Sequence, residues 1–149
     1  MNLKELYQEI ILDHGKNPRN LGKCMNYSHD AKGHNPLCGD KVHIYIKLDN
    51  ENKLDNISFE GEGCAISLAS ASILTETTKG KNLNIVKKIT HDFLNMIKNE
   101  EKISVNSLSD DQKTTIMSLS GVKQFPMRVK CATMAWHTLT SAIYGEKNE

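Results

Sequence analysis

The chain has 149 residues, of which 38% are hydrophobic and 25% charged, and this composition suits one domain with a single hydrophobic core. Lys and Arg number 19 against 18 Asp and Glu, so the formal net charge is only +1. Without a strong positive field we expect no nucleic-acid partner and no membrane partner. No apolar run reaches the roughly 18 to 20 residues of a membrane span, and the acidic N-terminal segment does not suit a signal peptide. We therefore expect one domain over residues 1–149, located in the cytoplasm.

The first half of the chain predicts one helix followed by a small sheet. Apolar residues at helical spacing begin at Leu3 and predict an amphipathic helix that ends near His14. Alternating apolar and polar residues over 42–48 predict a strand with one buried face, and the apolar residues of 54–59 complete an antiparallel hairpin. The weaker segment 24–31 is expected to add a third strand.

The second half of the chain predicts four helices. They are expected over residues 66–77, 86–97, 109–121 and 129–143. Ser109 opens the third of them with a capping-box sequence, and Gly145 stops the last. The polar stretch from Asn99 to Ser109 is expected to be a loop within the domain. Because strands and helices are grouped rather than alternating, the predicted fold class is α+β, a small antiparallel three-stranded sheet packed against about five helices.

Cysteine is the residue type that says most about chemistry in this chain. The four thiols are Cys24, Cys38, Cys64 and Cys131. A reducing cytosol disfavours structural disulfides, which leaves metal ligation or thiol chemistry for these side chains. The alternative is that they are small buried residues, since free cysteine is among the most buried residue types. The residues next to each cysteine help to distinguish ligation or thiol chemistry from plain burial.

Three potential ligands lie beside features that favour the anionic form. Cys38 and Asp40 flank Gly39 just before the first clear strand, and a glycine there lets the backbone fold so that thiolate and carboxylate face one point. Cys64 opens the helix of small residues after a glycine-rich segment, where the helix dipole lowers the pKa of a thiol.

The last cysteine completes a possible set of four ligands. Cys131 lies in the first turns of the last predicted helix, close to Arg128 and Lys130, whose charges also favour the thiolate. Three thiolates and the Asp40 carboxylate are enough to close a tetrahedral zinc site. The spacings are not the local Cys-x-x-Cys of a zinc finger, so plain packing of the cysteines stays open on these features alone.

The other polar residues form no known catalytic motif. The six histidines match no metal-binding pattern and are expected to be surface or cap residues. His34, four residues before Cys38, is a candidate to contact a ligand, although a surface position is favoured for it as well. Cys24 stands on the weak strand, where a packing role is favoured over ligation.

Four sequence motifs, taken together and in order, resemble the U-type iron–sulfur cluster assembly proteins, and most closely their SufU branch. The motifs are Asp13-His14 with Lys16 to Asn20, Asn35 to Asp40, Phe59 to Ser67, and Arg128 to Thr133. Lys130 stands where scaffold members of the family place a histidine, and residues 124–128 replace their chaperone-binding motif. These departures favour the SufU branch over the scaffolds.

The resemblance implies a zinc-dependent sulfurtransferase. Such a protein accepts persulfide sulfur from a pyridoxal-phosphate-dependent cysteine desulfurase of the SufS type and serves downstream cluster assembly proteins. The implied zinc ligands are Cys38, Asp40, Cys64 and Cys131, with Cys38 as the sulfur acceptor. The alternative is a scaffold that builds a nascent [2Fe–2S] cluster on the same residues.

Arg128 is the further residue to which the sequence assigns a catalytic role. Its guanidinium stays charged and offers forked donors, so we expect it to hydrogen-bond to a ligand oxygen or sulfur, first of all to Asp40. In that position it would offset the negative charge of the ligands.

Overall fold

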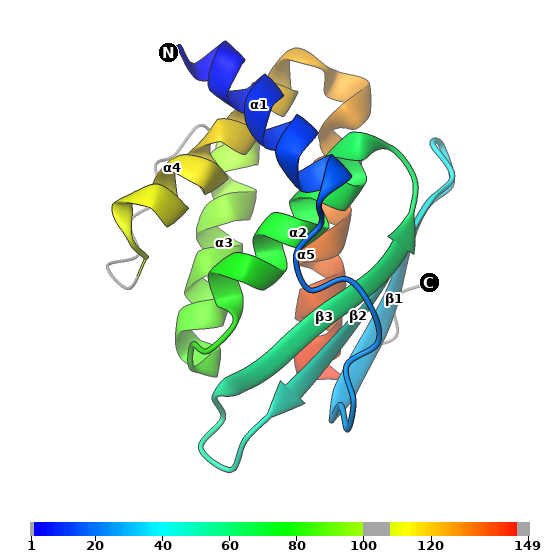
Figure 1. Ribbon diagram of the computed structural model, residues 1–149, viewed down its shortest axis with the longest axis vertical. Helices are drawn as coiled ribbons and strands as arrows, with labels where there is room; N and C mark the ends of the chain where they lie inside the picture. The colour runs from blue at the N-terminus through cyan, green and yellow to red at the C-terminus, as the bar shows by residue number, and fades with distance from the viewer. Residues whose placement is uncertain (1, 100–107, 146–149) are drawn as a thin grey trace.

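The computed structural model describes residues 2–99 and 108–145, and within them a three-stranded antiparallel sheet packs against five α-helices (Figure 1). The strands, in the order β1-β2-β3 across the sheet, are β1 (His29–Asn35), β2 (Asp40–Leu48) and β3 (Leu54–Glu62). The α-helices are α1 (Leu3–Lys16), α2 (Ala65–Thr78), α3 (Leu83–Asn99), α4 (Asp110–Ser118) and α5 (Val129–Tyr144). Two short 3-10 helices, η1 (Leu119–Gln124) and η2 (Pro126–Arg128), connect α4 to α5. The predicted α+β class is confirmed.

The sheet buries the face that the alternating pattern predicts. Val42, Ile44 and Ile46 of β2 point toward the helices and are buried. Tyr45 points to the other face and is buried too, because the segment before β1 covers it and the Tyr27 ring meets its ring edge-on at a centroid distance of 5.0 Å. One face of the sheet therefore rests on the helices, and the other is partly covered by residues that precede β1.

β1 lies later in the chain than the segment 24–31 in which the third strand is expected. The strand does alternate between exposed and buried residues, as at exposed Lys32 and buried Gly33. The sequence does not reveal this alternation, because most of the residues are polar or glycine. A Cβ at Gly33 would lie 2.1 Å from Thr138 Oγ1 of α5, so the glycine lets the strand approach that helix closely. A close backbone approach, rather than an apolar side chain, marks the inner face here.

The end of α1 is fastened along α2. A Cβ at Gly15 would lie 3.4 Å from Ala65 Cβ, and His14 Nδ1 lies 2.7 Å from Ser72 Oγ, which also accepts the backbone N–H of Arg19 at 2.8 Å. His14 is buried, which corrects the expectation that the histidines occupy surface or cap positions. Burial lowers the pKa of His14 and favours the neutral ring.

A buried hydrogen-bond network joins α2 to the first turns of α5. The Ser70 hydroxyl donates to the carbonyl oxygen of Ala132 at 2.5 Å and accepts from Trp136 Nε1 at 2.9 Å. The Trp136 ring in turn stacks on Phe93 of α3 at a centroid distance of 4.1 Å. Ala132 directly follows Cys131, so the network sets where that cysteine lies relative to α2.

The helix ends follow the predicted caps. The Ser109 side chain accepts from the backbone N–H of Gln112, and the Gln112 side chain returns a bond to the Ser109 backbone. Gly145 closes α5 with φ of 69°, in the left-handed region. The loop predicted between Asn99 and Ser109 lies mostly at 100–107, outside the described residues.

In the described part of the chain, the helices are too short or too polar to cross a membrane.

Candidate metal centre

The four predicted ligands lie at one end of the sheet. Cys38 occupies the turn between β1 and β2, and Asp40 is the first residue of β2. Cys64 is the N-cap of α2, and Cys131 lies in the first turn of α5. Figure 1 shows the β1–β2 turn, the end of β3 and the start of α2 at this same end. Residues far apart in sequence are thus brought to one place by the sheet and two helix starts.

Three of the four side chains form a compact group. The ligand atoms of Cys38, Asp40 and Cys131 all lie within 4.8 Å of one another. Cys38 Sγ and Cys131 Sγ are 3.6 Å apart and the cysteines are free, because a disulfide would need about 2.05 Å. Two thiolates bound at about 2.3 Å to a tetrahedral zinc ion would lie about 3.8 Å apart. The observed separation of the two sulfurs therefore suits ligands that share one ion.

Asp40 shows most directly that a cation fits here. The residue is fully buried, and its Oδ1 accepts the backbone N–H of Cys64 at 2.9 Å. Its Oδ2 is buried and has no hydrogen-bond partner among the described residues, which is unfavourable for a carboxylate unless a cation is present. Gly63, at φ of +145°, leaves room for this arrangement, since a Cβ there would lie 2.2 Å from Asp40 Oδ1.

Cys64 and Cys131 are placed differently around this carboxylate. Cys64 is half-buried and lies outside the group of three. Cys131 is fully buried, and its Sγ accepts from Asn35 Nδ2 at 3.7 Å. Cys64 therefore adjoins the group through its backbone N–H, which donates to Asp40.

The pKa of Cys131 runs against the sequence-based expectation. Burial raises the pKa of this thiol, and the neighbouring side chains of Asp40, Cys38 and Cys64 raise it further. We expected the neighbouring basic residues to favour the thiolate, but the loss of water around the buried sulfur outweighs them, and Lys130 is exposed. A bound cation would be needed to hold Cys131 as a thiolate.

Arg128 lies against sulfur rather than against the carboxylate. Its Nη1 donates to Cys38 Sγ at 3.8 Å. Hydrogen bonding with Cys131 and the charges of Cys64 and Cys38 raise the pKa of Arg128. The expected contact with Asp40 is wrong, because that carboxylate is buried and one of its oxygens is taken by the backbone N–H of Cys64. The exposed guanidinium therefore supplies positive charge on the solvent side of the thiols.

Two residues near the site are missed by the sequence analysis. Asn35 reads as part of an Asn-Pro turn signal, yet it ends β1 and hydrogen-bonds to Cys131. Tyr7 reads as one of the apolar residues of α1, yet its hydroxyl is buried without a partner among the described residues. Burial raises the pKa of Tyr7, the charges of Cys64 and Cys131 raise it further, and Arg128 lowers it. Only the fold relates these side chains to the cysteines.

Exposed apolar side chains lie close to Cys38 and Arg128 along the chain. Leu37, Phe125 and Met127 are 74%, 50% and 82% exposed. A groove of about 480 Å³ runs between α1 and the segment before α5, and Arg128 is one of its lining residues. The groove is lined by Tyr7, Gln8, Ile11, Leu12, Ile66, Phe125 and Arg128. Exposed apolar surface of this kind favours contact with another protein.

A second hollow, of about 360 Å³, lies on the other flank of the Cys38 turn. It is lined by His34, Asn35, Pro36, Leu37, Lys130, Thr133, Met134 and His137. His34 is exposed, as favoured from the sequence, and does not belong to the group of ligand atoms found among the described residues.

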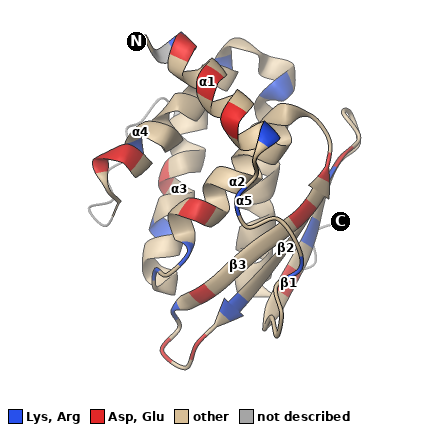
Figure 2. Cartoon of the chain, in the orientation of Figure 1, with Lys and Arg blue, Asp and Glu red and all other residues tan. Residues whose placement is uncertain are grey.

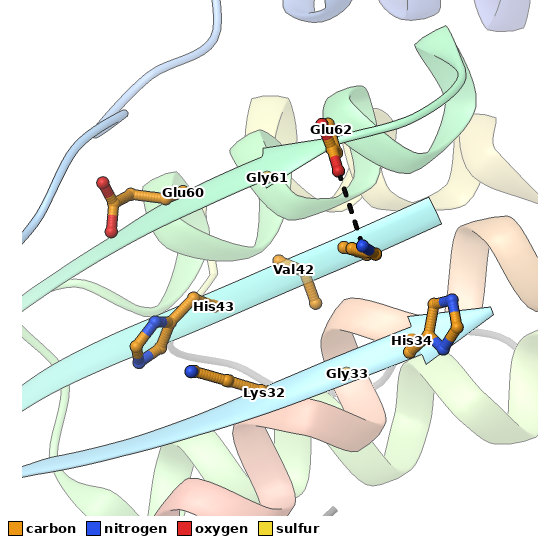
Figure 3. Close-up of a pocket in the computed structure, with 9 residues that line it drawn as sticks. Lys32, Gly33, His34, Val42, His43, Glu60, Gly61 and Glu62 are labelled. Atoms are coloured by element: carbon orange, nitrogen blue, oxygen red, sulfur yellow. Dashed lines mark ion pairs between the residues drawn. The ribbon is translucent and has the colours of Figure 1, made fainter. Parts of the chain in front are cut away.

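The largest hollow among those described, about 680 Å³, lies on the outer face of the sheet (Figure 3). It holds charged side chains of both signs, including the ion pair between Lys41 Nζ and Glu62 Oε1 at 3.9 Å. Figure 2 shows acidic residues along β3 beside basic residues of the other strands. Lys41 points to this outer face while the preceding Asp40 points inward, so the hollow is separated from the thiols by β2. Its lining contains no cysteine.

Cys24 lies apart from the other thiols. It is buried before β1 rather than on a strand, and its Sγ accepts from Asn56 Nδ2 at 3.3 Å. The favoured packing role is consistent with this position.

The chain is similar to proteins of iron–sulfur cluster assembly over most of its length. The zinc-dependent sulfurtransferase SufU of Bacillus subtilis is 40% identical over 146 residues, which cover 98% of this chain and 95% of that protein. The assembly scaffold IscU of Streptococcus pyogenes is 34% identical over 146 residues, which cover 98% and 87%. A crystal structure from Fervidobacterium islandicum, of a protein described as an assembly scaffold for the SUF system, matches with a TM-score of 0.80 and 33% identity. That match covers 93% of this chain and 97% of the other.

The family model for the NifU-like N-terminal domain matches residues 6–148. The resemblance that the four sequence motifs predict is thereby confirmed. The chain belongs to the NifU-like N-terminal domain family and is similar over most of its length to the SufU and IscU relatives named above.

Proposed function

We propose that this protein is a zinc-dependent sulfur carrier that accepts persulfide sulfur from a cysteine desulfurase for iron–sulfur cluster assembly. The observation that carries the proposal is the grouping of exposed Cys38 with buried Asp40 and Cys131, in which one carboxylate oxygen lacks a partner among the described residues. The similarity to a relative named a zinc-dependent sulfurtransferase, over nearly the whole of both chains, supports the same function.

Zinc is the cation that the donor set favours. Cys38, Asp40, Cys64 and Cys131 would hold it, and thiolate-rich sites select zinc over magnesium or calcium. Bound zinc keeps the cysteine sulfurs in the thiolate form and lowers their nucleophilicity. Such a cation would give the unpartnered Asp40 oxygen a partner. It would also hold Cys131 as a thiolate although the pKa of that thiol is raised.

Cys38 is the thiol placed to accept sulfur. It is the exposed member of the group and lies in the turn between β1 and β2, where the next residue, Gly39, has φ of +72°. Its thiolate attacks the outer sulfur of the partner's cysteine persulfide. A new sulfur–sulfur bond forms on Cys38 while that of the partner breaks, and the partner's cysteine leaves as a thiolate. The exchange is a transfer of sulfur without net oxidation.

Arg128 is the side chain placed to assist this exchange. Its guanidinium hydrogen-bonds to Cys38 Sγ, so it stabilises the attacking thiolate. We assign it the role of a catalytic residue on this contact. The exposed apolar side chains of Leu37, Phe125 and Met127 supply surface on which a desulfurase, dependent on pyridoxal phosphate, would dock.

A scaffold function is the second candidate. The relative from Streptococcus pyogenes, similar over 98% of this chain, is named an assembly scaffold. Three cysteines and Asp40 could ligate a nascent [2Fe–2S] cluster in place of zinc. Metal content separates the two functions, because a zinc carrier is colourless and a cluster scaffold is brown with bound iron.

The test combines metal analysis with desulfurase kinetics. We expect one zinc per chain in the wild-type protein and in Cys24→Ser, and loss of zinc in Cys64→Ala and Cys131→Ala. Zinc-loaded wild-type protein is expected to accelerate cysteine turnover by a SufS-type desulfurase, whereas Cys38→Ala is not. Full zinc occupancy in Cys131→Ala, or equal acceleration by Cys38→Ala, would contradict the proposal. Bound iron with brown colour would favour the scaffold.

A further inference from the structure

The neighbouring sulfurs of Cys38 and Cys131 accept hydrogen bonds from different donors. Arg128, which is exposed and charged, donates to the exposed Cys38 thiol. Asn35, which is neutral and only 4% exposed, donates from Nδ2 to Cys131 Sγ at 3.7 Å. Cys131 is itself fully buried, so this second bond is made away from water. The buried thiol thus has a buried donor of its own.

Asn35 is fixed at the end of the sheet by its backbone. It is the last residue of β1 and pairs with Asp40, the first residue of β2. Paired residues of antiparallel strands place their side chains on the same face, so the two buried side chains are neighbours. The Asn35 carbonyl oxygen accepts the backbone N–H of Cys38 at 3.3 Å and that of Gly39 at 2.8 Å, which closes the turn. One residue is therefore linked to Cys38, Asp40 and Cys131.

The bond from Asn35 to Cys131 joins two separate parts of the centre. Cys38 and Asp40 belong to the β1–β2 hairpin, whereas Cys131 belongs to α5. The donor and the acceptor of this bond are 96 residues apart in the chain. A donor that contacts a metal ligand fixes the orientation of the ligand and tunes its electron density. The Asn35 side chain therefore sets where the helix ligand lies relative to the hairpin ligands.

We propose that Asn35 is a positioning residue, whose carboxamide N–H keeps Cys131 Sγ in place as a fixed metal ligand while Cys38, in the turn that the Asn35 carbonyl closes, is the ligand that is exchanged. The proposal rests on the proposed function for the presence of zinc and the release of Cys38. Asn35 acts through the sulfur of Cys131, so it is not a catalytic residue.

Asn35→Leu is the direct test, because leucine has nearly the shape of asparagine, lacks the N–H donor and keeps the backbone carbonyl of the turn. Zinc affinity is measured by competition with a chromophoric chelator, and we expect about a tenfold loss. The protein is then loaded with Co²⁺, which absorbs light by charge transfer from its sulfur ligands. Loss of a donor raises the energy of the sulfur electrons, so the absorption should move to longer wavelength. An absorption at the wild-type wavelength would overturn the role of Asn35, whatever the affinity.

Asn35→Ala is the second variant, because it removes the same donor without placing an apolar group beside Asp40. We expect the same direction of shift in its Co²⁺ absorption. Thermal unfolding of the metal-free proteins shows which of the two variants is folded. A folded variant without the shift would contradict the proposal.

Asn56→Leu is the matched control, since it removes the same kind of hydrogen bond away from the centre. Asn56 Nδ2 donates to Cys24 Sγ at 3.3 Å, and Cys24 is not one of the proposed ligands. Zinc affinity and Co²⁺ absorption should both stay at the wild-type values. Equal changes in Asn35→Leu and Asn56→Leu would show a general effect of losing an amide and would refute a specific role for Asn35.

The role of Cys131 as the fixed ligand is tested without Cys38. Zinc release into excess chelator is timed for Cys38→Ala and for Cys38→Ala combined with Asn35→Leu. We expect Cys38→Ala to bind zinc through the remaining ligands, and the added Asn35→Leu to speed release about tenfold. Equal rates of release, or no zinc in Cys38→Ala, would show that Asn35 does not hold a fixed ligand.

Failure of the proposed function can be told apart from failure of this inference, because these measurements use no desulfurase. A wild-type protein that binds neither zinc nor cobalt would overturn both. A metal-binding wild type whose Co²⁺ absorption matches that of Asn35→Leu would overturn only the role of Asn35.

Discussion

Asp40 is the residue whose surroundings depend most on a cation. One of its carboxylate oxygens accepts the backbone N–H of Cys64, and the other is buried without a partner among the described residues. A charged group in that state destabilises the metal-free fold and stabilises the metal-bound one. Under the proposed function, the same side chain therefore ties the stability of the protein to bound zinc.

Asp40→Asn separates these two effects. An amide keeps the shape and the acceptor for Cys64 but removes the buried charge, so metal-free protein should gain about 1 kcal/mol of unfolding free energy. Zinc affinity should fall at least about tenfold. Urea denaturation with and without zinc measures both. Asp55→Asn, an exposed position on β3, is the control and should change neither quantity. A destabilised metal-free Asp40→Asn would contradict this account of Asp40.

Arg128→Ala should impair sulfur transfer more than zinc binding, because the guanidinium contacts Cys38 from the solvent side and supplies no ligand atom. We expect about a tenfold loss of desulfurase stimulation with zinc retained. Lys130→Ala, an exposed neighbour on α5, is the matched control for lost positive charge. Equal losses of desulfurase stimulation in both variants would show that Arg128 contributes only its positive charge and that its contact with Cys38 has no specific role.

At the scale of elements, two buried contacts fix the helices that carry Cys64 and Cys131. Ser70 of α2 bonds with Ala132 and Trp136 of α5, and His14 of α1 contacts Ser72 of α2. These contacts depend on the small residues of α2, which let neighbouring helices approach closely and place hydroxyl groups at the contacts. The helix starts are thereby held in position before any metal binds.

Ser70→Ala tests the contact between α2 and α5. It leaves the Trp136 N–H buried without its acceptor, and the loss should be about 1–3 kcal/mol of unfolding free energy. That corresponds to a fall of roughly 2–4 °C in midpoint temperature for each kcal/mol. Ser58→Ala, whose hydroxyl has no described partner, should not be destabilising. Calorimetry of the two variants compares them, and equal stability would show that the network contributes nothing.

His14 predicts how stability depends on pH. Its folded-state pKa lies below the ordinary 6.5, chiefly through burial and then through the charge of Arg19. Below pH 6.5 the unfolded chain therefore binds a proton that the folded protein does not, so stability is lost as the pH falls further. In metal-free protein, urea titrations from pH 7 to about 5 should show a shallower loss for His14→Asn than for wild type. The exposed His137→Gln should keep the wild-type slope; an identical slope in His14→Asn would contradict this assignment.

At the scale of the whole molecule, the fold brings three separate segments to one end of the sheet. The β1–β2 turn brings Cys38 and Asp40, the start of α2 brings Cys64, and the start of α5 brings Cys131. The centre has a buried side at Asp40 and an exposed side at Cys38. Such a division suits a carrier whose metal stays bound while one thiol reacts.

Much of this arrangement can be predicted from the sequence. Periodicity gives the helices, the β2–β3 hairpin and the α+β class, because those elements bury regular apolar faces. Strand β1 is displaced, since its inner face offers only the small Ala31, a close backbone approach at Gly33 and the polar Asn35, which give no regular apolar period. The contact of Arg128 with Cys38 and the positions of Asn35 and Tyr7 depend on packing between distant segments. The periodicity of the sequence cannot predict such packing.

The central claim is that Cys38 accepts sulfur, and mapping the persulfide tests it most directly. Zinc-loaded protein is incubated with a SufS-type desulfurase and limiting cysteine, trapped with an alkylating reagent, and analysed by peptide mass spectrometry with parallel zinc measurement. We predict persulfide on Cys38 alone, with zinc retained. Persulfide on Cys64 or Cys131 with Cys38 unmodified, or stoichiometric release of zinc with each transfer, would contradict the account.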